Sequence, residues 1–163
     1  MGTPEWEDYA ASQAEAYLLK VRDRRRTQDA LMRERLDALE MLDGIKAVRY
    51  DGVGGGGCTD PDGAMMAAIE SLDACVRRIQ ASVSEFNALY TSCLDSLRKM
   101  EDPTLRAVLS GYYVRANTWQ AVADELHYSV DNVYKLRPRA LVAFYYVMPH
   151  RWRDPMHRAD ADL

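Results

Sequence analysis

The chain has 163 residues, of which 48% are hydrophobic and 28% charged, and its formal net charge is −4. This composition is typical of a soluble globular protein and excludes a disordered chain. No apolar run approaches the roughly 20 residues that cross a bilayer, and the N-terminal segment MGTPEWEDY is acidic, unlike the basic start of a signal peptide. We therefore expect a cytoplasmic protein with no membrane partner.

Cysteine and histidine residues do not form a pattern typical of a metal centre or a catalytic site. Cys58, Cys75 and Cys93 are odd in number and widely spaced, so they fit neither a disulfide framework nor a zinc site. The three histidines are isolated, and no serine lies in a nucleophile-elbow context. We expect neither an enzyme nor a protein that binds a cofactor, a metal ion or a small-molecule substrate.

Two helices are expected before residue 50. Thr3 and Pro4 form a typical helix start, a capping residue followed by proline in the first turn. This N-terminal helix has only a weak apolar stripe, interrupted by alanines. A second helix is expected from Gln28 to Val48, where leucines recur at helical spacing. The basic run KVRDRRR (20–26) between them is more often a solvated helical face than a nucleic-acid contact.

Residues 51–63, DGVGGGGCTDPDG, interrupt the helical pattern. A phosphate-binding loop ends in Gly-Lys-Ser/Thr, whereas this glycine run ends in Gly57-Cys58-Thr59 and contains no lysine. We interpret it as a flexible connection that lets the helices on either side fold back on each other.

A long apolar stripe follows the glycine-rich segment. Five heptads with apolar a and d positions predict a helix over about 64–100 in a coiled coil or an antiparallel hairpin. Its stripe must be buried against the 28–48 helix, the N-terminal helix or a second copy of the chain. The stripe consists of Met65, Ile69, Leu72, Val76, Ile79, Val83, Phe86, Tyr90, Cys93, Leu97 and Met100.

Asp102-Pro103 separates this region from a C-terminal segment with the pattern of three short helices, 103–114, 118–126 and 129–137. His127 lies in the turn before the last helix, where a residue that tolerates positive φ is needed. Ser129 can cap that helix by accepting a hydrogen bond from an amide near Asn132.

Ala123 is small where the last two helices would cross. Two helices joined by such a tight turn are typical of the DNA-binding helix-turn-helix. Pro138 should kink or end the second helix, unless it opens a further helix. Leu141, Phe144 and Val147 are expected to pack in the core, and residues 149–163 to form a loose tail.

Positive charge is concentrated at this end of the chain. Residues 127–158 hold six Lys/Arg against two Asp, a balance of +4, whereas residues 1–126 hold fifteen Lys/Arg against twenty-one Asp/Glu, a balance of −6. A local positive field favours phosphate contacts even when the net charge is negative. A balance of +4 is modest, so the segment alone should bind DNA weakly.

Residues 102–141 carry an R-x-V-L helix with paired tyrosines, followed by the helix-turn-helix, and this run resembles region 4 of the bacterial sigma-factor family. Residues 30–145 are similar to a family of prophage proteins described as sigma-like regulators of phage late genes. The resemblance implies promoter DNA and RNA polymerase as partners. The chain departs from the pattern at Asn117, Gln120, His127 and Pro138. Matching residues are Arg106, Val108, Leu109, Tyr112, Tyr113, Thr118, Val122, Ala123, Leu126 and Ser129.

We therefore expect an all-α protein with a long antiparallel helical hairpin or coiled coil in residues 1–101 and a small three-helix helix-turn-helix domain in residues 102–148. The predicted function is a phage-type transcription regulator that binds double-stranded DNA. A homodimer or docking on RNA polymerase would supply additional affinity. The alternatives are a DNA-packaging component such as a terminase small subunit, or a structural interaction protein.

The base-reading candidates lie near the start of the second helix of the helix-turn-helix, where side chains reach the major groove. They are Asp131, Asn132, Tyr134 and Lys135. The phosphate-binding candidates are Arg115, Arg137 and Arg139.

Overall fold

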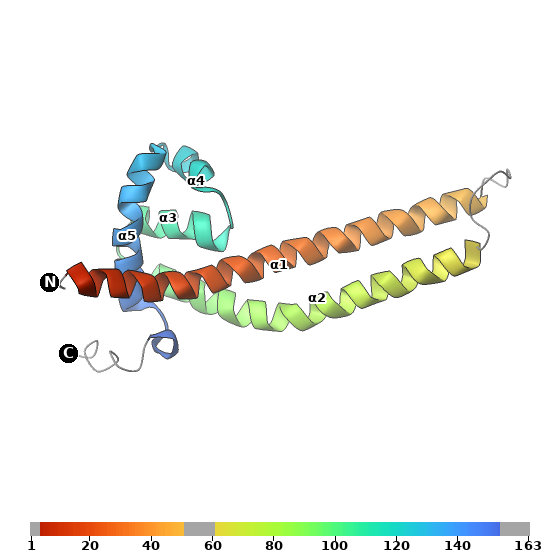
Figure 1. Ribbon diagram of the computed structural model, residues 1–163, viewed down its shortest axis with the longest axis horizontal. Coiled ribbons are helices and arrows are strands. Elements are labelled where there is room, and N and C mark those ends of the chain that lie inside the picture. Colours follow the sequence, from red (N-terminus) through yellow and green to blue (C-terminus); the bar gives the residue numbers. More distant parts are fainter. Residues whose placement is uncertain (1–3, 51–60, 154–163) are drawn as a thin grey trace. The chain divides into compact units, whose positions relative to one another are not determined.

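The computed structural model describes residues 4–50 and 61–153. Within these ranges the chain forms helices and turns and no β-strand, which confirms the all-α fold class (Figure 1). None of the described helices combines the length and the apolarity needed to cross a membrane. The glycine-rich connection predicted at 51–63 lies almost entirely outside the described residues.

Two long helices begin the chain, α1 (Pro4–Tyr50) and α2 (Pro61–Arg98). The expectation of two separate helices before residue 50 is wrong. No glycine or proline occurs between Glu5 and Asp43, so nothing in this stretch ends a helix, and the basic run 20–26 continues it.

The chain divides into two compact units, one with residues up to Arg26 and from Phe86 onward, the other with Thr27–Glu85. The predicted boundary between residues 101 and 102 falls inside the first unit.

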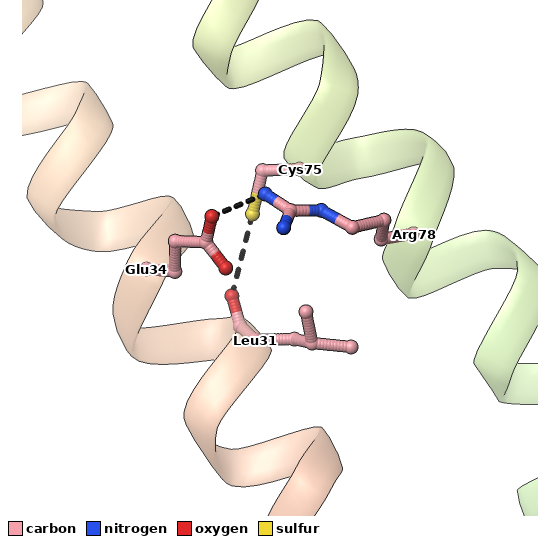
Figure 2. A network of polar contacts seen from close by, with 4 residues as sticks. All are labelled: Leu31, Glu34, Cys75 and Arg78. Atoms are coloured by element: carbon pink, nitrogen blue, oxygen red, sulfur yellow. Dashed lines mark hydrogen bonds and ion pairs between the residues drawn. The ribbon is translucent and has the colours of Figure 1, made fainter.

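In the Thr27–Glu85 unit, α1 and α2 lie side by side and antiparallel, as the sequence predicted for the 28–48 and 64–100 helices. Figure 2 shows Leu31 and Glu34 of α1 facing Cys75 and Arg78 of α2. The Cys75 thiol donates to the Leu31 carbonyl over 3.5 Å, and Arg78 forms an ion pair with Glu34. Elsewhere along the same pair of helices, Gln28 Nε2 of α1 donates to Ser82 Oγ of α2 over 3.0 Å.

The predicted seam of α2 is rotated from its expected position. Leu72, Ile79, Phe86 and Tyr90 were expected to be buried, but all four are only partly buried, and Ile69 is 43% exposed. The buried positions of this unit are instead small: Ala38, Ala68 and Cys75. Small side chains let two helices approach closely, and this close contact leaves the larger apolar residues of α2 at its margin.

The first unit contains the main core, which combines buried residues from both ends of the chain. The N-terminal helix was expected to have only a weak apolar stripe, yet Ala10, Ala14, Tyr17, Leu18 and Val21 of α1 are buried. The two alanines are small, so neighbouring helices can pack tightly around them. The buried core residues are Ala10, Ala14, Tyr17, Leu18, Val21, Cys93, Leu97, Met100, Leu105, Leu109, Tyr113, Val114, Ala140, Leu141, Phe144, Tyr145 and Met148.

After α2, the chain forms α3 (Pro103–Leu109), the π-helical turn η1 (Ser110–Val114), α4 (Trp119–Leu126) and α5 (Val130–Val147). Pro103 begins α3 as predicted, and the Asp102 carboxylate accepts from the Thr104 and Leu105 amides.

α5 continues through Pro138, so the predicted end of the helix, or start of a further helix, at that residue is wrong. Pro138 is exposed, which leaves the Tyr134 carbonyl, deprived of its helical donor, on the side that water reaches. Leu141 and Phe144 are buried as predicted, and Val147 is partly buried.

The expectation of a loose tail from residue 149 is wrong for residues 149–153. A 3₁₀-helix, η2 (His150–Trp152), follows α5. Arg153 is 4% exposed, and its guanidinium donates to the Tyr146 and Met148 carbonyls over 2.8 and 3.1 Å. Carbonyls at the end of α5 thus hold the chain in place.

Candidate nucleic-acid interface

α4, a tight turn and α5 form the helix-turn-helix that the sequence predicted. Thr118 caps α4, with its hydroxyl accepting from the Ala121 amide over 3.2 Å. His127 ends α4 in the left-handed region at φ 56°, as predicted from its place in the turn. The Ser129 hydroxyl accepts from the Asn132 amide over 3.2 Å, which confirms the predicted cap of α5.

Small and β-branched residues fill the contact between these helices. Ala123 is fully buried with Val108, Val122 and Val133, in agreement with the small residue expected at the crossing. Gly111 in η1 approaches α4 so closely that a Cβ atom there would lie 2.8 Å from Val122 Cγ2. The packing therefore fixes the distance between η1, α4 and α5 with little tolerance for added atoms.

The outer face of α5 presents the four predicted base-reading residues. Asp131, Asn132, Tyr134 and Lys135 are all exposed in the first two turns of the helix. These side chains offer a carboxylate, an amide, a phenol and an ammonium group, which can donate to or accept from base edges. Pro138 and Arg139 continue the same exposed face.

The three predicted phosphate-binding residues lie in different surroundings. Arg139 is exposed. Arg115 is 45% exposed and forms an ion pair with Glu125 over 2.7 Å. Arg137 is 31% exposed and forms an ion pair with Glu15 of α1. Only Arg139 is thus presented to solvent without an ion pair to the helix-turn-helix or to α1 among the interactions described.

Glu15 joins α1 both to η1 and to the helix-turn-helix. Besides pairing with Arg137, it accepts a hydrogen bond from the Tyr113 hydroxyl over 2.9 Å. Burial raises the pKa of Tyr113, and the hydrogen bond to Glu15 adds to the rise. Burial alone would lower the pKa of Arg137, but its bonds to Glu15 and Tyr113 outweigh this and raise it. Arg137 therefore stays charged and holds α5 against α1.

An aromatic stack supports the loop before α4. The Tyr112 ring lies between the Arg22 guanidinium, 3.8 Å from its centre, and the parallel Trp119 ring, 3.7 Å away. Arg22 is 4% exposed and donates to the carbonyls of Tyr112 and Asn117. Burial lowers the pKa of Arg22. Within the run 20–26, this arginine is therefore a packing residue that holds η1 and the following loop.

Neither Glu15 nor Arg22 was singled out from the sequence as a residue of this site. Their partners lie 90 to 122 residues away along the chain, so local spacing carries no signal for them.

Contacts inside the unit also reduce the positive charge that the C-terminal segment presents to solvent. Of the basic residues in 127–153, Arg137 and Arg153 are engaged inside the unit, which leaves Lys135, Arg139 and Arg151 exposed.

The described residues include no group of three or more His, Cys, Asp or Glu side chains that could hold a metal ion. No family model, curated protein or solved structure matches this chain. The sigma-like resemblance therefore remains a prediction from the residues of the run 102–141.

Proposed function

We propose that this protein is a DNA-binding transcription regulator that reads promoter DNA with the exposed face of α5. The observation that carries the proposal is the capped α4–turn–α5 unit with Asp131, Asn132, Tyr134 and Lys135 on its outer face. In helix-turn-helix proteins, residues at the start of the second helix contact base edges in the major groove. Asn132 is suited to adenine, and Lys135 to guanine.

The charge of this face argues for low affinity by one copy alone. Lys135 and Arg139 are accompanied by the exposed carboxylates of Asp124, Glu125 and Asp131. Each phosphate that a protein neutralises contributes to affinity and to its salt dependence, so few cations give weak binding at physiological salt. Additional contacts must come from a second copy or from RNA polymerase, the partner that the sigma-like resemblance implies.

Two substitutions separate base reading from phosphate binding. Asn132→Ala removes an amide from the base-reading face, so we expect a change in the sequence preference of DNA selected from a random pool. Arg139→Ala removes a phosphate contact, so we expect weaker binding to all sequences and a salt slope reduced by about one. Arg77→Ala is the matched control because it removes an exposed arginine of the Thr27–Glu85 unit, which contains no residue of the helix-turn-helix.

Binding is measured with and without added core RNA polymerase. Specific binding by the protein alone indicates a self-sufficient regulator, and a promoter complex formed only with polymerase indicates a sigma-like mode. Absence of specific binding under both conditions contradicts the proposal. A ring of eight or more copies would instead favour a DNA-packaging component such as a terminase small subunit.

A further inference from the structure

The Thr27–Glu85 unit leaves several large apolar side chains exposed on its two helices. Of the nine large apolar residues that are exposed in the described chain, five belong to this unit, although it is the smaller of the two units. They lie on both helices: Met32, Leu36 and Met41 on α1, and Met66 and Ile69 on α2.

The ion pair of Figure 2 shows on which face some of these residues lie. Leu31 and Cys75 contact each other, and the residues three positions after them, Glu34 and Arg78, form an ion pair on one side of that contact. With 3.6 residues per turn, the residue directly after a contact residue lies on the other side of the contact from the residue three positions after it. Met32 and Val76 therefore lie on the second face of the pair.

The same rule adds further apolar residues to this second face. Leu39 follows the buried Ala38, Ile69 follows the buried Ala68, and Val83 follows Ser82, which is bonded to Gln28. On α2 the row Ile69, Val76 and Val83 repeats every seven residues, which is the spacing that two parallel helices use to pack along a common seam.

Residues that flank this row on α2 lie at the same level along the pair as residues of similar or opposite character on α1. The contacts of Gln28 with Ser82 and of Leu31 with Cys75 place Arg35 about level with Asp73, and Leu42 about level with Met66. Met66 and Asp73 lie on the outer side of the Ile69 row on α2, and both are exposed. Asp73 is paired with Arg77 of its own helix over 2.9 Å, with both side chains largely solvated, so that pair is weak.

We propose that a second copy of this chain packs on this face, with the two α2 helices parallel and related by a two-fold axis along them. Ile69, Val76 and Val83 then meet their own counterparts along the seam. The outer side of each α2 faces α1 of the other copy at the same level. This arrangement places Asp73 beside Arg35 and Met66 beside Leu42, a charge pair and an apolar pair, twice in each dimer.

This inference goes beyond the proposed function and does not depend on it. The first measurement is the mass of the full chain by sedimentation equilibrium, where we expect twice 18.5 kDa. Ile69→Lys should give a monomer with unchanged helicity because Ile69 is already 43% exposed within one chain. Ala81→Lys, an exposed position on the opposite side of α2, is the matched control and should remain a dimer.

A charge exchange tests the orientation of the two copies. Arg35→Asp places two aspartates at each contact, and Asp73→Arg places two arginines there, so each variant alone should be a monomer. An equimolar mixture restores an opposite-charge pair at both contacts and should form a mixed dimer. A monomeric parent, a ring, single variants that stay dimeric, or a mixture that stays monomeric would each overturn the proposal.

Discussion

Gly111 lies where η1 comes closest to α4. A methyl group at this residue would lie 2.8 Å from Val122 Cγ2 and 3.2 Å from Arg115 Nη2. Val122 is 1% exposed, so it has no free space into which to move. The glycine is therefore required by close packing, since its own backbone conformation is helical.

We expect Gly111→Ala to destabilise the protein by about 1–3 kcal/mol, the usual cost of overpacking, despite the better helix propensity of alanine. Gly44→Ala is the matched control because nothing lies within 4 Å of its added Cβ atom, and it should be neutral or stabilising by up to about 1 kcal/mol. Urea unfolding measures both. The packing argument fails if the two substitutions have equal effects, and Val122→Ala should partly rescue Gly111→Ala.

At the scale of single residues, the sequence predicted what depends on near neighbours. His127 and Ser129 follow rules of helix ends that involve partners within four residues, and both have the expected geometry. The other positive φ, 57° at Ala116, was not predicted, because alanine carries no signal for that conformation. Glu15 and Arg22 were missed because their contacts depend on how the chain folds over long sequence distances.

Among the elements, α5 shows how tertiary packing can override a local signal. Pro138 removes one helical hydrogen bond, and a proline inside a helix costs about 3 kcal/mol. The buried residues Ala140, Leu141 and Phe144 hold the second half of α5 in the core, so the helix continues beyond the proline. The sequence pattern alone does not reveal which of these two effects is larger.

Pro138→Ala should therefore stabilise the protein by about 1–3 kcal/mol, because it restores the amide that can donate to the Tyr134 carbonyl while the exposed position needs no repacking. Thermal unfolding measures this change. Arg139→Ala serves as the control, as it alters the neighbouring exposed residue without changing the backbone. A fall in melting temperature for Pro138→Ala would mean that the proline ring itself makes a stabilising contact.

The helix α2 illustrates a second limit of prediction from sequence. The heptad pattern correctly predicted a long helix that packs along 28–48, but not which side of its stripe faces α1. Ala68 and Cys75 lie on one side of the row formed by Leu72 and Ile79, and Ile69 and Val76 lie on the other side. Both sides are apolar, so hydrophobic periodicity does not distinguish them. Close packing against Ala38 and the bond between Gln28 and Ser82 favour the side with small residues.

At the scale of the whole molecule, the core of the first unit joins residues from both ends of the chain. Tyr17 of α1 stacks on Phe144 of α5, with ring centres 6.0 Å apart, and its hydroxyl donates to the Leu89 carbonyl over 3.5 Å. Cys93 of α2 is fully buried in the same cluster. A sequence boundary after residue 101 does not anticipate this core, because the weak stripe of the N-terminal helix does not reveal its partners.

Burial of this core predicts a loss of stability in alkali. Burial raises the pKa of Tyr17 from 10.0 to about 12 and that of the Cys93 thiol from 9.0 to about 12. Below pH 9 both groups are protonated whether the chain is folded or unfolded, and stability is complete. Between pH 9 and 12 the unfolded chain releases these protons while the folded chain retains them, so the free energy of unfolding should fall by an amount on the order of several kcal/mol.

Urea unfolding at pH 8, 10 and 11 measures this fall, and Tyr17→Phe assigns part of it. The variant cannot ionise at this position, so it should lose less stability between pH 10 and 11 than the parent does. Tyr134→Phe is the control because Tyr134 is 47% exposed and lies outside the buried core. A free energy of unfolding that stays constant up to pH 11 would contradict the buried, protonated state of both groups. An equal gain from Tyr134→Phe would instead assign the effect to general tyrosine ionisation, since the two variants differ only in which phenol is removed from the chain.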